Sequence, residues 1–237
     1  MNLESFKSLQ MRRDGKVLYA AFNQPERMNP IDRNTASELI RLFEESSSDP
    51  LTHVIVLTGN GRAFSAGGDV EAMQRGIDDP ALFADSVVHS KRLIFAQLEC
   101  TKPIIAKVNG HAMGLGATVA LFCDVIFAAD TVKFADPHVK MGFVAGDGGA
   151  VIWPQLIGYA RAKEYLMTGD TVSAADAQRM GLVNHCVPAA ELDARVDEFS
   201  KRLASGASRA IQWTKVSVNI GLRQLAHSIM DAGMAYE

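Results

Sequence analysis

Short apolar runs rich in valine and isoleucine alternate with stretches of helical spacing, and this alternation narrows the possible folds more than any other feature. Four runs have the length and β-branched content of buried strands: residues 16–22, 53–58, 103–108 and 124–128. Between them, apolar side chains recur at helical spacing over residues 32–48, 80–100 and 114–121. The recurring strand, strand, helix order predicts an α/β sheet protein.

Beyond residue 148 almost the whole chain has a helical pattern. Helices are predicted at residues 149–157, 160–168, 173–180, 191–204 and 222–230, with one short strand at residues 183–187. Ser173 and Asp176 have the spacing of a helix cap. The 237 residues fit one large domain or a domain with a small appendage. We therefore expect a core domain over residues 1–205 and a C-terminal helical region over residues 206–237.

Composition and charge exclude several classes of protein. With 48% apolar and 22% charged residues, the chain has the composition of a folded globular protein. The net charge of −3 argues against a nucleic-acid partner. No apolar stretch reaches the ~18 residues of a membrane span, and the first residues lack a signal-peptide pattern, so we expect no membrane partner and a cytoplasmic location. Cys100, Cys123 and Cys186 form no Cys-x-x-Cys pair, which predicts buried reduced thiols.

Two glycine-rich loops are the clearest functional signal. They cover residues 61–69 (GRAFSAGGD) and 109–116 (NGHAMGLG), and each follows a predicted strand and precedes a helical stretch. Backbone N–H groups at such a position favour negative charge. Small residues in both loops let a ligand approach the main chain. We therefore expect an anion to bind here.

Other glycine-loop motifs do not fit these residues. A dinucleotide-binding fingerprint needs Gly-x-Gly-x-x-Gly, but Gly114 and Gly116 are followed by residues 117–119 (ATV). A phosphate-binding Walker loop would end in Gly-Lys-Ser/Thr, which is absent. A nucleophile elbow at Ser65 would need glycine where Ala63 stands.

The two loops, with residues 23–30 (NQPERMNP) and 102–110 (KPIIAKVNG), resemble the crotonase (enoyl-CoA hydratase/isomerase) family over roughly residues 15–220. The resemblance implies a spiral of strand-strand-helix (ββα) turns with a helical C-terminal region. It also implies an acyl-CoA thioester substrate, with coenzyme A entering as part of the substrate and no permanently bound cofactor. Two N–H groups on one thioester oxygen would stabilise an enolate.

The resemblance also assigns site residues by position. The amides of Gly68 and Leu115 would form the oxyanion hole. Substrate or coenzyme contacts are expected from Arg27, near the phosphates, and from Ala66, Gly67, Asp69 and Gly114, with Asp69 chiefly fixing the shape of its loop.

Family membership further implies homotrimers or dimers of trimers assembled through C-terminal helices. Relative to the family pattern the sequence stops early, at Glu237, after the predicted helix 222–230. A short or truncated closing segment is therefore expected at the active-site lid and the trimer contact.

The two catalytic glutamates of the family's hydratases do not occur in this sequence. Their positions fall on Thr118 and His138. Threonine cannot act as a carboxylate base, whereas histidine can exchange protons near neutral pH. Asp147, in residues 142–149 (GFVAGDGG), is the remaining candidate acid/base. The resemblance implies this role, because some family members, such as naphthoate synthases, carry a functional aspartate at this place. Its competing interpretation is a helix N-cap.

Several alternatives remain open at this level. Asp136 and His138 could supply two metal ligands, but without a third we expect no metal site. The favoured function is hydration, dehydration or isomerisation of an enoyl-CoA without the usual glutamate pair. The alternatives are a noncatalytic acyl-CoA-binding or assembly subunit, and a hydrolase of C–C bonds that uses the same oxyanion hole.

Overall fold

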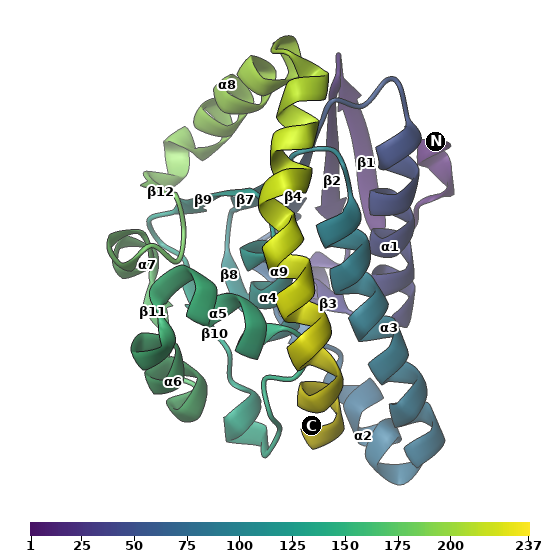
Figure 1. Ribbon diagram of the computed structural model, residues 1–237, viewed down its shortest axis with the longest axis vertical. Coiled ribbons are helices and arrows are strands. Elements are labelled where there is room, and N and C mark those ends of the chain that lie inside the picture. Colours follow the sequence, from purple (N-terminus) through teal and green to yellow (C-terminus); the bar gives the residue numbers. More distant parts are fainter.

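A six-stranded sheet runs across the upper half of the molecule, from β1 on the right to β12 on the left (Figure 1). The structure is a computed structural model that describes the backbone of residues 1–237 and every side chain except those of Pro80 and residues 83–86. Its strands follow the order β1 (Leu9–Asp14), β2 (Val17–Phe22), β4 (Val54–Gly59), β7 (Ile104–Val108), β9 (Val125–Ala129) and β12 (His185–Val187). Only β1 and β2 pair antiparallel, and the other strands are parallel.

Two smaller sheets lie beside the large one. The first has the order β11 (Val172–Ser173), β10 (Lys133–Ala135), β8 (His111–Met113) and β5 (Ala63–Ser65), and the second pairs β3 (Pro30–Ile31) with β6 (Gly67–Gly68). Three successive strand pairs, β4–β5, β7–β8 and β9–β10, each give one strand to the large sheet and the next to the four-stranded sheet. This confirms the spiral of ββα turns.

Helices cover the sheets and carry the rest of the chain. They are α1 (Arg33–Ser48), α2 (Val70–Asp78), α3 (Pro80–Glu99), α4 (Leu115–Leu121), α5 (Gly149–Ile157), α6 (Tyr159–Thr168), α7 (Ala174–Met180), α8 (Leu192–Ser205) and α9 (Ser208–Tyr236). Asp32 caps α1 through Thr35 N at 2.8 Å, and Ser173 caps α7 as predicted. In the part of the chain that the structure describes, none of them combines the length and apolar character needed to cross a membrane.

The last helix is much longer than predicted. We expected a helix over residues 222–230, but α9 has 29 residues and passes from α8 to the neighbourhood of α2 (Figure 1). Weak helix formers near Asn219 and Gly221 hid its first half from a propensity argument. Packing overrides propensity here, because α9 lies against α3, α5 and α8 and buries Ala226 and Met230 completely.

Candidate active site

The two glycine-rich loops lie side by side because the strands within them pair. β5 and β8 run parallel, with Ala63 opposite His111. Gly67 has φ +95°, and a Cβ atom there would lie 2.6 Å from the carbonyl oxygen of Met113. Glycine is therefore required at Gly67 by both the backbone conformation and the close approach of the second loop.

Both loops open into one cavity of about 500 Å³. The cavity brings together five residues predicted from the sequence, which are Gly68, Asp69, Leu115, His138 and Asp147. Its apolar part is formed by side chains from α2, α3, α9 and the loop before α5, including Met73, Leu82, Leu93, Phe143 and Met234. An apolar cavity with a few convergent polar groups is the usual form of a small-molecule site.

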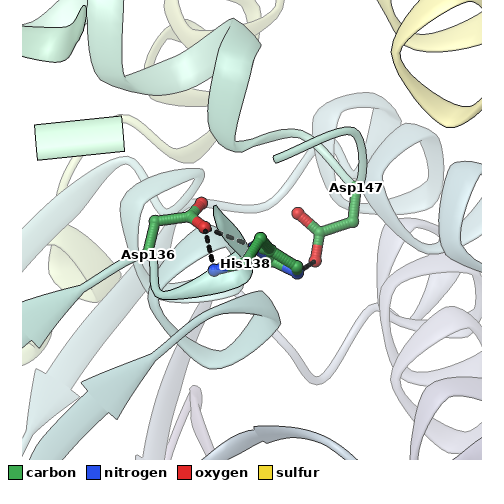
Figure 2. Close-up of side chains that lie close together, drawn as sticks. All are labelled: Asp136, His138 and Asp147. Atoms are coloured by element: carbon green, nitrogen blue, oxygen red, sulfur yellow. Dashed lines mark hydrogen bonds and ion pairs between the residues drawn. The ribbon is translucent and has the colours of Figure 1, made fainter. Parts of the chain in front are cut away.

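Three buried ionisable side chains meet at the wall of this cavity (Figure 2). His138 opens the 3₁₀ turn His138–Met141 that follows β10, and its ring lies between Asp136 and Asp147. Nδ1 of His138 is hydrogen-bonded to Oδ1 of Asp136, and Nε2 lies 3.4 Å from Oδ2 of Asp147. One imidazole is thus held by two carboxylates that come from different segments of the chain.

This arrangement fixes the charge of His138. Burial alone would lower the pKa of His138, but the charge of Asp147 and the hydrogen bonds to Asp136 and Asp147 outweigh it and raise the pKa to about 11. Burial also raises the pKa of Asp136, against the opposing hydrogen bond from His138. His138 is therefore an imidazolium at neutral pH, and our expectation that it exchanges protons near neutrality is wrong.

Asp147 does not cap α5. The N-cap of that helix is Gly148, which offers no side chain, so the capping interpretation is wrong. Instead, Oδ1 of Asp147 accepts a hydrogen bond from Thr118 Oγ1 at 3.3 Å, and Oδ2 faces His138. Thr118 and His138 are the two positions to which the resemblance in sequence assigned the family's glutamates. The structure therefore puts a single carboxylate in contact with both of them.

The same cluster corrects the expectation that no third metal ligand is near. Asp147 joins Asp136 and His138, with one ligand atom from each residue within 4.8 Å of the others. Each ring nitrogen of His138 already faces a carboxylate, which leaves the imidazole no free nitrogen for an ion. We interpret the cluster as a network of paired charges.

The remaining predicted residues lie around the cavity or outside it. Asp69 fixes its loop as expected, since it caps α2 through Glu71 N at 3.1 Å and accepts from Arg27 at 3.2 Å. Arg27 does not line the cavity, and neither do Ala66, Gly67 and Gly114. Ala66 N donates to the Met28 carbonyl at 2.9 Å, and Gly114 is the N-cap of α4.

Four charged residues that line the cavity were not predicted as site residues: Asp32, Arg33, Arg75 and Glu237. Arg33 and Arg75 contribute cations, and Glu237 contributes a carboxylate from the end of α9. Arg33 follows the cap of the first predicted helix, and this was its only local signal. No signal pointed to Glu237, because its position depends on how a long helix packs.

Known proteins share this architecture across nearly the whole chain. The family model for enoyl-CoA hydratase/isomerase matches residues 12–234. An enoyl-CoA hydratase/isomerase from Mycobacterium paratuberculosis superposes with a TM-score of 0.93 at 33% identity, covering 97% of this chain and 92% of that one.

Two curated relatives extend this likeness to sequence. A crotonyl-CoA hydratase of Syntrophomonas wolfei is 32% identical over 221 residues, 92% of this chain and 84% of its own length. A carnitinyl-CoA dehydratase of Escherichia coli is 36% identical over 206 residues, 86% of this chain and 77% of its own. With the fold and the paired loops, these matches identify the chain as a member of the enoyl-CoA hydratase/isomerase family and an enzyme of that type.

Proposed function

We propose that the protein adds water to, or removes it from, the double bond of an acyl-CoA thioester, with Asp147 as the acid/base for water. The observation that carries the proposal is the contact of Asp147 with both Thr118 and His138, in the cavity that Gly68 and Leu115 also line. One carboxylate occupies the space between the two positions where the family's hydratases carry glutamates.

The thioester oxygen would be bound by the N–H groups of Gly68 and Leu115. Both residues line the cavity, and glycine at Gly67 lets the two loops approach closely. Negative charge that develops on this oxygen during water addition is stabilised by such fixed donors, each worth about 10²–10³ in rate. The same donors serve an isomerisation, which also passes through an enolate.

Asp147 would handle the water. As its carboxylate takes a proton from water, the water oxygen attacks Cβ and the electron pair of the double bond moves to the thioester oxygen. His138 faces the same carboxylate with its positive charge, and Thr118 donates to the other oxygen. These two contacts hold the carboxyl plane at the cavity wall, so that it is oriented before substrate arrives.

The test is hydration of crotonyl-CoA by the wild type and by Asp147→Asn, followed by loss of the absorbance of the conjugated thioester. We expect kcat to fall about 10²–10⁴-fold, the usual contribution of a positioned base. Asp170→Asn is the matched control, because this carboxylate is exposed and pairs with Lys140 outside the cavity.

Calorimetric titration with coenzyme A separates the alternatives. Coenzyme A binding without turnover of any enoyl thioester would favour the noncatalytic acyl-CoA binder. Cleavage of a diketone without coenzyme A would favour the C–C hydrolase. Full hydration by Asp147→Asn would rule out the assigned role of Asp147.

Cofactor content and assembly complete the proposal. Coenzyme A enters only as part of the substrate, and we expect dialysis against EDTA to leave kcat unchanged. We also propose a homotrimer or a dimer of trimers. Support comes from apolar side chains exposed along α9, which include Trp213, Val218 and Ile220. Light scattering on the eluting protein measures the assembly directly.

A further inference from the structure

Glu237 carries a buried carboxylate oxygen that has no hydrogen-bond donor. Its side chain lines the cavity together with His138, Asp147 and Met234. Among the described side chains, Oε2 of Glu237 is one of the few buried polar atoms without a partner. An unsatisfied buried oxygen is costly, and such groups concentrate where function requires them. The Glu237 side chain lines the cavity, so its carboxyl group lies beside the space that a substrate would occupy.

A close backbone contact holds Glu237 next to the loop of Asp147. A Cβ atom on Gly146 would lie 2.5 Å from the carbonyl oxygen of Gly233 and 2.7 Å from Oε2 of Glu237. Glu237 N donates back to the Gly233 carbonyl at 3.1 Å, which keeps the last turn of α9 intact. The absence of a side chain at Gly146 thus allows the end of α9 to reach the site.

The charges around Glu237 favour its protonated form. Burial raises the pKa of Glu237, the charges of Asp147 and Asp136 raise it further, and that of His138 opposes them, giving about 8. At neutral pH this carboxyl is mostly a proton donor. The other ionisable residues that line the cavity are Asp32, Arg33, Asp69, Arg75 and His89.

Hydration needs two different proton transfers. One group must take a proton from water, and a second must give a proton to the α-carbon of the enolate. Two carboxyl groups whose surroundings differ in charge are suited to such a division of roles. Asp147 faces the imidazolium of His138, whereas Oε2 of Glu237 has no hydrogen-bond donor among the described residues.

We propose that Glu237 is the second catalytic acid/base and exchanges the proton at the α-carbon of the acyl-CoA. This inference rests on the proposed function. After water has added to Cβ, the carboxylic acid of Glu237 gives its proton to Cα, and the enolate electrons return to re-form the thioester carbonyl. The proton that Asp147 took from water then passes through solvent to the Glu237 carboxylate. The sum is addition of one water molecule.

The test measures the two proton transfers separately. Hydration of crotonyl-CoA requires both groups, whereas deuterium uptake at the α-carbon of butyryl-CoA in D₂O requires only the α-carbon base. We expect Glu237→Gln to lower both rates by about a hundredfold or more. We expect Asp147→Asn to lose hydration but keep the exchange. Asp231→Asn changes an exposed carboxylate of α9 and should keep both.

The pH dependence distinguishes catalysis from a structural role. Wild-type hydration should fall above pH about 8 as Glu237 loses its proton, and exchange should rise over the same range. Glu237→Asp should keep both trends with lower rates.

Glu237→Gln rates within about threefold of the wild type would overturn the inference. If the wild type exchanges but does not hydrate, the proposed function fails while loss of exchange in Glu237→Gln still supports the inference. If the wild type does neither, both fail.

Discussion

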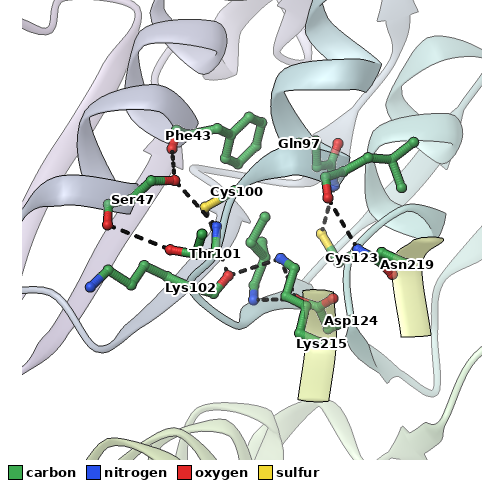
Figure 3. A network of polar contacts seen from close by, with 12 residues as sticks. Phe43, Ser47, Gln97, Cys100, Thr101, Lys102, Cys123, Asp124, Lys215 and Asn219 are labelled. Atoms are coloured by element: carbon green, nitrogen blue, oxygen red, sulfur yellow. Dashed lines mark hydrogen bonds and ion pairs between the residues drawn. The ribbon is translucent and has the colours of Figure 1, made fainter. Parts of the chain in front are cut away.

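Two buried groups of charges differ in how completely they are paired. In the first, which we call the anchor, Nζ of Lys215 on α9 lies 2.8 Å from Oδ2 of Asp124 and 2.9 Å from the carbonyl oxygen of Lys102 (Figure 3). Oδ2 of Asp124 also accepts from Ile104 N at 2.7 Å. In the second group, at the site, Asp136 Oδ2 and Glu237 Oε2 are buried without a donor among the described residues.

The difference in pairing matches a difference in function, because the anchor stabilises the fold and the site acts on a substrate. The anchor ties α9 to the segments that enter β7 and β9, and each buried polar atom of Lys215 and Asp124 has a partner in the described part of the chain. The site leaves acceptors unpaired next to a cavity. Stability is sacrificed at sites that must keep free groups for a substrate.

Two of the three cysteines lie close to the anchor. Cys100 and Cys123 are buried near Lys215, and burial is the main cause of the raised pKa of each thiol. Cys186 is also free but only half-buried. The prediction of burial holds for Cys100 and Cys123 and is wrong for Cys186.

The largest effect should come from breaking the anchor. Lys215→Met leaves Asp124, whose side chain is 22% exposed, without its cation. Removing one partner of a buried pair costs about 3–5 kcal/mol in the free energy of unfolding, and this partial exposure places the expected loss at the lower end of that range. Urea unfolding measures the loss, and kcat of the remaining folded protein should stay near that of the wild type. The double variant Lys215→Met/Asp124→Leu should recover part of the loss. Equal stability of Lys215→Met and the wild type would contradict the role of the anchor.

A smaller effect is expected from Asp136→Asn at the site. Asp136 acts through His138, so loss of its charge should lower the pKa of His138 and loosen the ring that faces Asp147. We expect kcat to fall by about 10²-fold. The free energy of unfolding should fall as well, because His138 loses part of the pKa shift that stabilises the folded state. NMR titration of His138 supplies the readout that a structural role would not give. An unchanged imidazole pKa would show that Asp136 does not control this ring.

A smaller effect of the same cluster is expected in the pH dependence of the free energy of unfolding. The folded pKa of His138, about 11, lies above its ordinary value of 6.5. Its contribution is therefore complete below pH about 6.5 and is lost as the pH rises towards 11, with a slope of up to about 1.4 kcal/mol per pH unit. Chemical unfolding at about pH 7, 8 and 9 should show a steeper decline in unfolding free energy for the wild type than for His138→Gln. Parallel curves would be inconsistent with a charged His138.

The smallest effect should belong to an exposed pair. Arg27 bonds Asp69 at 3.2 Å, but the Arg27 side chain is 42% exposed, so Arg27→Gln should change unfolding free energy by about 0–1 kcal/mol. Because Arg27 is a candidate phosphate contact, Arg27→Gln should instead raise KM for crotonyl-CoA and leave kcat unchanged. Crotonyl-pantetheine, which lacks the nucleotide phosphates, is the control substrate. An equal rise in KM for both substrates would remove Arg27 from the phosphate site.

Local pattern was enough to predict most of the fold. The buried strands and α1, α3 and α5 through α8 form near their predicted bounds, because apolar spacing and caps such as Asp32 act over a few residues. The two-residue and three-residue strands, such as β6 and β10, carry too little pattern to be seen. The strand predicted at residues 183–187 is shorter in the structure, where β12 covers His185–Val187. Asn184 lies just before β12, and its side-chain Oδ1 accepts a hydrogen bond from Ile126 N.

The site was predictable only where it depended on the loops. Gly68 and Leu115 could be assigned from the loop motifs, and Asp147 from its neighbourhood in the sequence. The contacts that define their surroundings span large separations, as between Thr118 and Asp147. The position of Glu237 requires the packing of an entire helix, which no local pattern specifies.

The length of α9 has a consequence for local stability. Glu237 lies 22 residues beyond Lys215, about 33 Å along the helix at 1.5 Å per residue. Amides near Lys215 should exchange hydrogen only when the whole protein unfolds, whereas those of the last turn can open locally. Local opening of this turn would withdraw Glu237 from the cavity, and a ligand that contacts Glu237 would oppose the opening.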